Sequence, residues 1–164
     1  MNSLVVVGIG NPYRRDDGVG PAVLHRLTGR VPVGTFLAES DGEPAALIEL
    51  WDGARLTVVI DAVHTPAGPR HAPLPGRVYR LGVHHPGYRA GAASSHAVDL
   101  GEAVGLARVL GRLPQRMLLY GIEAGAVGFG VGLTPAVARA ADRVAAEVSE
   151  LLAAEAARIR DGVA

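Results

Sequence analysis

The sequence predicts an α/β fold in which one mostly parallel sheet is covered by helices on both sides. Three short apolar runs, Leu4–Val7, Leu56–Ile60 and Met117–Ile122, are typical of strands that are buried on both faces. These runs alternate along the chain with segments of helical periodicity, which is the pattern of a parallel sheet. The chain has 164 residues, 49% of them hydrophobic, and no linker or repeat divides it, so we expect a single domain over residues 1–164.

Two helices and a short strand are predicted between the first and second apolar runs. A loop spans Gly8 to Asp17, and apolar residues at helical spacing then predict a helix from Val19 to about Leu27. A short strand is expected from Thr35 to Glu39. The next helix, from Pro44 to Trp51, opens with a proline, which the first turn of a helix accepts readily.

The second half of the chain predicts an edge strand and two longer helices. Polar and apolar residues alternate from Arg77 to Val83, which favours a strand exposed on one face. Ser94 or Ser95 is expected to cap the next helix, and Thr134 with Pro135 to begin the last and longest one. The expected apolar stripe of the first of these helices is Leu100, Ala103, Val104, Ala107 and Leu110. That of the longest helix is Val137, Ala141, Val144, Val148, Leu151 and Leu152.

Composition excludes several classes of function. The formal net charge is zero and the basic residues are all arginines spread along the chain, so no basic patch for nucleic acid or an anionic membrane is indicated. No apolar run approaches the roughly 20 residues of a membrane-spanning helix, and the N-terminus lacks the basic start of a signal peptide. We therefore expect a cytoplasmic protein. Because the chain has no cysteine, histidine and carboxylate side chains would have to bind any metal.

Residues of chemical interest follow each of the three predicted buried strands. In open parallel sheets, ligands bind beyond the carboxyl ends of the strands. Beyond these ends lie the segment Gly8–Gly20 with its acidic pair Asp16-Asp17, then Asp61, and then Glu123 with the glycine-rich stretch Gly125–Gly132. His96 lies between them in the first turn of a predicted helix.

The glycine-containing loop after the first strand has two interpretations. Gly8-Ile9-Gly10 is similar to a dinucleotide-binding fingerprint, but Tyr13 stands where the third glycine belongs. That motif also needs a helix that begins at once, whereas Pro12 and charged residues intervene here. Nucleotide binding is thus a minor alternative, and the favoured interpretation is that the glycines permit a tight exit from the strand.

The acidic residues and histidines indicate a possible metal site. Asp16 or Asp17 could simply cap the following helix, a contribution of about 1 kcal/mol. Asp61 is predicted to end the second buried strand, where a carboxylate is costly unless it is hydrogen-bonded or metal-bound, so structural and functional roles both stay open. A helix N-terminus disfavours imidazolium and keeps His96 neutral, as a metal ligand must be.

Three protein ligands of this kind would suit a divalent ion with open coordination positions, as in catalytic sites. His64, close to Asp61 in sequence, is the main rival ligand, while His84 and His85 lie in predicted loops.

Four segments together resemble the hydrogenase maturation proteases, a family of small nickel-dependent endopeptidases. The first, and the most specific, combines Gly8-Ile9-Gly10-Asn11 with Asp16-Asp17-Gly18-Val19-Gly20. The other three are Val58–Val63, Ser94-Ser95-His96 with Leu100, and Tyr120–Glu123 followed by Gly132-Leu133-Thr134-Pro135. They span nearly the full chain in the order of the family.

The resemblance implies a function, a site and a fold. It implies that Asp17, Asp61 and His96 bind nickel, which the substrate supplies and for which other divalent metals could substitute. The implied activity is removal of a C-terminal peptide from a [NiFe]-hydrogenase large-subunit precursor by a monomeric enzyme. Because the motif segments contain no cysteine and Ser94 and Ser95 are better explained as helix caps, our hypothesis for the mechanism has no protein nucleophile. The implied fold is a three-layer α/β/α domain with a twisted five-stranded sheet.

One segment departs from the family pattern, and two alternatives to the protease remain. Ser40-Asp41-Gly42-Glu43-Pro44 keeps an Asp-Gly pair but lacks the glycine/threonine turn of many relatives, which puts substrate contacts of this loop in question. A nickel chaperone with the same ligands would bind metal without cutting the precursor. A nucleotide-binding α/β domain would be stabilised by a nucleotide but not by divalent metals.

Overall fold

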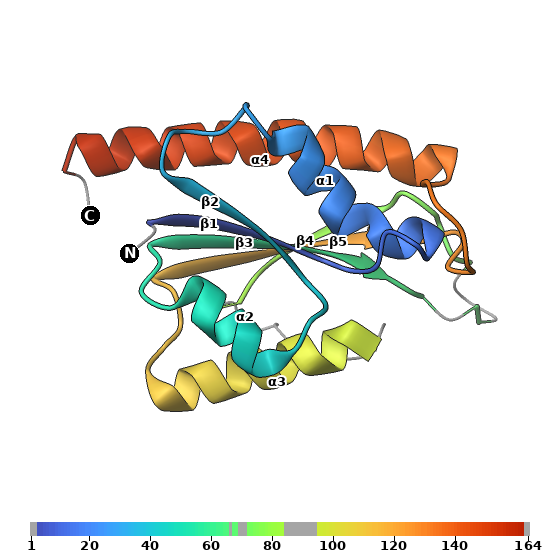
Figure 1. The fold of residues 1–164 in the computed structure, drawn as a ribbon, viewed down its shortest axis with the longest axis horizontal. Coiled ribbons are helices and arrows are strands. Elements are labelled where there is room, and N and C mark those ends of the chain that lie inside the picture. Colours follow the sequence, from blue (N-terminus) through green and yellow to red (C-terminus); the bar gives the residue numbers. More distant parts are fainter. Residues whose placement is uncertain (1–2, 66, 69–71, 84–94, 163–164) are drawn as a thin grey trace.

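Five strands form one sheet in the order β2-β1-β3-β5-β4 (Figure 1). The computed structural model describes residues 3–65, 67–68, 72–83 and 95–162, without the side chains of residues 95–98. The strands are β1 Leu4–Ile9, β2 Thr35–Ser40, β3 Leu56–Val63, β4 Val78–Gly82 and β5 Arg116–Glu123. All neighbouring pairs are parallel except β4 with β5, so the predicted mostly parallel sheet is confirmed, with its antiparallel strand at an edge.

Helices cover both faces of the sheet and make three layers (Figure 1). Helices α1 Val19–Leu27 and α4 Pro135–Arg160 pack on one face, and α2 Pro44–Trp51 and α3 Ser95–Leu110 pack on the other. A short 3-10 helix, η1 Arg15–Gly18, leads directly into α1. No helix in the described part of the chain is long and apolar enough to cross a membrane.

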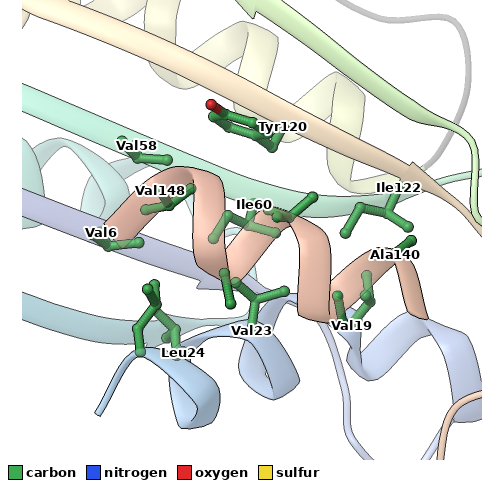
Figure 2. Packing of buried hydrophobic residues seen from close by; sticks show 14 of the residues in the cluster. Val6, Val19, Val23, Leu24, Val58, Ile60, Tyr120, Ile122, Ala140 and Val148 are labelled. Atoms are coloured by element: carbon green, nitrogen blue, oxygen red, sulfur yellow. The ribbon is translucent and has the colours of Figure 1, made fainter. Parts of the chain in front are cut away.

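Alternation along the strands builds two separate hydrophobic cores. Leu4 and Val6 of β1 point to the side of α1 and α4, whereas Val5 and Val7 point to the side of α2 and α3. Figure 2 shows the first core, in which strand side chains such as Ile60 meet those of the two helices. Each fully buried aliphatic side chain contributes about 1.5–3 kcal/mol, which is why continuous apolar runs form the central strands.

The strand order creates a switch point between β1 and β3. From β1 the chain goes to β2 at one edge of the sheet, and it then crosses to the other side of β1 to form β3. Helix α1, which follows β1, and helix α2, which precedes β3, therefore lie on opposite faces of the sheet. Ligands of open α/β sheets bind at such a point.

The predicted elements are present in the predicted order, and three details differ. Strand β3 continues through Val63, because it pairs with β5 as far as Glu123. Asp61 therefore lies inside the strand, and the prediction that it ends the strand is wrong. Leu110, at the end of α3, is 53% exposed and not part of the buried stripe, whereas Leu151 is half-buried and packs against the first core as expected. Thr134 is the N-cap residue of α4 as predicted, but its side chain makes no capping hydrogen bond.

Candidate active site

Glycines bring the first turn of α1 against the carboxyl ends of β1 and β3. A Cβ atom on Gly20 would lie 2.3 Å from the carbonyl oxygen of Ile9 and 2.8 Å from that of Ile60. A Cβ atom on Gly8 would lie 2.6 Å from the carbonyl carbon of Gly20. Only glycine allows this approach of backbone to backbone. The segment that follows β1 is thereby fixed at the switch point.

The same packing counts against the nucleotide-binding interpretation. A Cβ atom on Gly18, the N-cap residue of α1, would lie 2.7 Å from the Cα atom of Pro12. The loop after β1 therefore folds over the start of the helix, where a pyrophosphate would have to sit. Gly10, with φ of 136°, lets the chain turn at the end of β1, as the favoured interpretation of the sequence predicted, and Gly8 also serves close packing, which the sequence did not predict.

Asp17 lies in η1 and is only 6% exposed. The loop between β1 and η1 donates a hydrogen bond to its carboxylate. The backbone N–H of Asn11 donates to Oδ2 of Asp17 at 2.9 Å, and Oδ1 of Asn11 accepts from the N–H of Tyr13 at 2.9 Å. The η1 turn contacts β3, the strand of Asp61. Neither Asp16 nor Asp17 is the N-cap of α1, which is Gly18, so the capping interpretation of this pair is wrong.

Asp61 is 8% exposed and lies next to Ile60, the residue that Gly20 contacts. Val59 belongs to the core on the side of α2 and α3, and strand alternation places Asp61 on that same face. Its partner in β5 is Gly121. Two buried carboxylates, one from the turn after β1 and one from β3, thus belong to the switch point.

His96 lies in the first turn of α3, and its side chain is outside the described part of the structure, as are His84 and His85 entirely. Figure 1 shows the first residues of α3 on the side of the molecule toward which the parallel strands run. His64 directly follows β3 and is half-buried. Among the described residues, no group of three His, Asp or Glu side chains is arranged to hold a metal ion.

Asp16, next to the candidate ligand, holds the glycine-rich loop after β5. It is fully buried, and its Oδ2 accepts from the N–H of Gly125 at 2.8 Å, the N–H of Ala126 at 2.9 Å and the hydroxyl of Thr134 at 2.8 Å. Its Oδ1 accepts from the N–H of Thr134 at 2.7 Å. These partners lie 109 to 118 residues further along the chain, so no local pattern could have separated Asp16 from Asp17.

Glu123, the last residue of β5, has a comparable structural role. It is 1% exposed, and its carboxylate accepts from the N–H of Leu74 at 2.9 Å and from the hydroxyl of Tyr79 at 3.0 Å. Glu123 therefore ties the segment before β4 to the end of β5. The sequence placed Glu123 among the candidate functional residues beyond the strand ends, but its two hydrogen-bond partners account for its burial.

Comparison with known proteins identifies the family. A family model described as HycI, hydrogenase maturation protease, matches residues 42–151, which is more than half of the chain and includes Asp61 and His96. The chain belongs to the hydrogenase maturation protease family. It is accordingly a peptidase with a role in hydrogenase maturation. No curated protein matches the sequence.

Solved structures of hydrogenase maturation proteases share the fold over nearly the whole chain. The maturating endopeptidase HybD of E. coli superposes with a TM-score of 0.78 at 19% identity, covering 93% of each chain. The [NiFe]-hydrogenase maturation protease HybD of Thermococcus kodakarensis gives a TM-score of 0.70 at 22% identity, covering 91% of this chain and 97% of its own. The segment of Asp17 lies before the range of the family model. At such low identity the superpositions show a common fold and assign no residue a role.

Proposed function

We propose that this peptidase removes the C-terminal extension of a nickel-loaded [NiFe]-hydrogenase large-subunit precursor, with Asp17, Asp61 and His96 binding the nickel of the substrate. The observation that carries the proposal is the placement of two buried carboxylates at the β1/β3 switch point of a hydrogenase maturation protease. The names of the structural relatives, which describe maturation of [NiFe] hydrogenase, support the choice of substrate.

The chemistry of these side chains fits a divalent ion. Asp17 and Asp61 are both at least nine-tenths buried, and carboxylate oxygens are ligands that divalent ions accept. Two carboxylates and one imidazole form an oxygen and nitrogen set that nickel accepts, and other divalent metals could substitute for it. Three protein ligands leave coordination positions for groups of the precursor.

The scaffold of the site favours precise positioning. Asp61 lies within a central strand, and Asp17 lies on a turn that glycines press against that strand. The two residues thus hold the substrate at a fixed place, and the scissile bond is brought beside them. The nickel of the precursor would supply a Lewis acid for the scissile carbonyl, and the carboxylate of Asp17 or Asp61 would serve as the base that takes up the proton of the attacking water.

The test is the intact mass of a nickel-loaded cognate precursor after incubation with the protein. We expect loss of one C-terminal peptide with the wild type, and no loss with Asp17→Asn, Asp61→Asn or His96→Ala. Asp142→Asn, which changes an exposed carboxylate on α4, is the matched control and should cleave normally. Nickel-free precursor should stay intact.

Two outcomes would contradict the proposal. A folded His96→Ala variant that cleaves at the wild-type rate would remove His96 from the site. An unchanged mass with the wild type and a verified nickel-loaded precursor, together with measurable nickel binding, would instead identify a maturation chaperone. The cytoplasmic location and the monomeric state stay predictions, which fractionation of cells and sedimentation of the pure protein would check.

A further inference from the structure

Three large apolar side chains project from two loops beside the candidate active site. Tyr13 is 70% exposed, Phe129 is 93% exposed and Val131 is 77% exposed. Tyr13 belongs to the loop that leads into η1, and the other two belong to the loop between β5 and α4. We refer to Tyr13, Phe129 and Val131 as the apolar tip. Single exposed apolar residues are ordinary, but a group of three on adjoining loops marks an interaction surface.

Backbone hydrogen bonds hold these two loops together. Arg14 and Gly130 form an isolated parallel bridge, in which the N–H of Arg15 donates to the carbonyl of Gly130 at 2.9 Å. The N–H of Gly130 donates to the carbonyl of Tyr13, also at 2.9 Å. The four hydrogen bonds that Asp16 accepts fix the same loop further along.

The backbone beside the apolar tip is strained at Arg15. Arg15 has φ of 49°, and it is the only residue other than glycine with a positive φ among the described residues. Such a conformation costs about 1–3 kcal/mol and persists only where the surroundings impose it, commonly at functional sites. The hydrogen bonds between the two loops therefore keep the side chains of the apolar tip exposed to solvent.

The tip is mechanically continuous with the candidate ligand Asp17. The backbone N–H of Asn11 donates to Asp17, and the side chain of Asn11 accepts from the N–H of Tyr13. A single residue, Asn11, therefore links Asp17 to Tyr13 through two hydrogen bonds. A macromolecule that brings its nickel to Asp17 must therefore pass beside the loop that carries Tyr13. This adjacency points to the precursor, and not to an unrelated partner, as the occupant of the tip.

The charges around the tip define the chemistry of the partner. Arg14 and Arg15 are both exposed, and neither takes part in any salt bridge between described residues. Behind Val131 lies a hollow of about 280 Å³, whose lining includes Arg15, His25 and Leu133. The surface thus combines exposed apolar groups, two guanidinium groups and room for an inserted side chain, and it fits an apolar surface that carries carboxylates.

We propose that the apolar tip, together with Arg14 and Arg15, is a docking surface for an apolar, carboxylate-bearing face of the large-subunit precursor. This inference rests on the proposed function, because the precursor is its partner. The tip takes no part in cleavage. It contributes affinity for the protein substrate, as a few large side chains at an interface generally do.

The experiment measures the rate of precursor cleavage against precursor concentration. For the double variant Tyr13→Ser/Phe129→Ser we expect KM to rise about tenfold or more with kcat little changed, because the lost contacts act on binding alone. Val109→Ser, which changes an 84% exposed residue of α3, is the matched control and should keep the wild-type KM. Replacing Arg14 by Ser should raise KM at low salt and have less effect at high salt, since screening weakens exposed charge pairs.

Each result decides a different question. Wild-type KM in the double variant would overturn the docking surface and leave the proposed function intact. A wild-type protein that cleaves no verified nickel-loaded precursor would overturn the proposed function, and the docking surface with it. Sedimentation of the wild type and of the double variant tests for self-association. A dimeric wild type and a monomeric double variant, with KM unchanged, would assign the tip to self-association and overturn docking of the precursor. Equal melting temperatures of variants and wild type confirm that each variant is folded.

Discussion

At the scale of single residues, two neighbouring aspartates have different roles because their partners differ. Asp16 is fully buried and accepts four hydrogen bonds from the loop that leads into α4. Asp17 accepts one from Asn11 and lies on the turn that contacts β3. A structural carboxylate thus stands directly beside the candidate metal ligand and fixes both the tip and the start of α4.

Replacing Asp16 by Asn should lower the free energy of unfolding by about 3 kcal/mol, because the new amide group places donors against N–H donors and leaves them unsatisfied. Urea unfolding followed by circular dichroism measures this change. The control Asp142→Asn removes an exposed ion pair with Arg26 and should cost less than about 1 kcal/mol. A loss for Asp16→Asn as small as that of the control would show that the four bonds are not a structural anchor.

At the scale of elements, the site depends on how closely α1 approaches the sheet. Gly8 and Gly20 let the helix begin in direct contact with the backbones of β1 and β3. The same contact places η1, and with it Asp17, at the strand that carries Asp61. The glycines thus determine the position of a carboxylate that is distant from Asp61 in sequence.

Two glycine-to-alanine substitutions should act in opposite directions. Gly20→Ala should destabilise the fold by about 3 kcal/mol, because its methyl group would overlap backbone atoms that cannot move independently. Gly105→Ala lies in α3 with no atom within 4 Å of the added carbon, and should stabilise by about 0.5–1 kcal/mol through helix propensity. Thermal or urea unfolding of both variants checks the pair. Equal effects would mean that the close approach of α1 to the sheet is unimportant.

At the scale of the whole molecule, Tyr120 joins the sheet to the longest helix. It is 1% exposed in the core between β5 and α4, and its hydroxyl donates to Oε1 of Glu147 on α4 at 2.9 Å. The guanidinium of Arg80 on β4 lies 5.6 Å from the centre of its ring. Burial, followed by the hydrogen bond to Glu147, raises the pKa of Tyr120 well above its usual value.

This shift predicts a loss of stability in alkali. The folded protein keeps Tyr120 protonated, whereas the unfolded chain loses that proton near pH 10, so stability is complete below about pH 10 and falls as the pH rises further. The chain has no lysine or cysteine and only four tyrosines, so few other groups titrate in this range. Free energies of unfolding from about pH 9 to about pH 11 should decline in the wild type and less steeply in Tyr120→Phe. Tyr13→Phe, at a 70% exposed position, should match the wild type; a decline that is the same in all three proteins would contradict the role of Tyr120.

The order and the approximate bounds of the elements could be predicted from the sequence, because burial patterns and helix-start residues are local signals. Helices α1 and α2 begin and end at the predicted residues, and Pro135 begins α4 as expected. The fold class followed from these elements, because alternating strands and helices pack well in few other ways. The sequence also placed Asp17 and Asp61 beyond or near strand ends, where sites form in such sheets.

Features that depend on contacts between distant segments could not be predicted from the sequence and are visible only in the folded structure. The length of β3, and hence the place of Asp61 inside the strand, is set by pairing with β5. The roles of Asp16 and Glu123 depend on donors that other loops supply, and the apolar tip exists because two loops more than 100 residues apart share hydrogen bonds. A local sequence pattern indicates that a residue is buried. The hydrogen-bond partner that compensates this burial comes from a distant segment and is brought close only by folding.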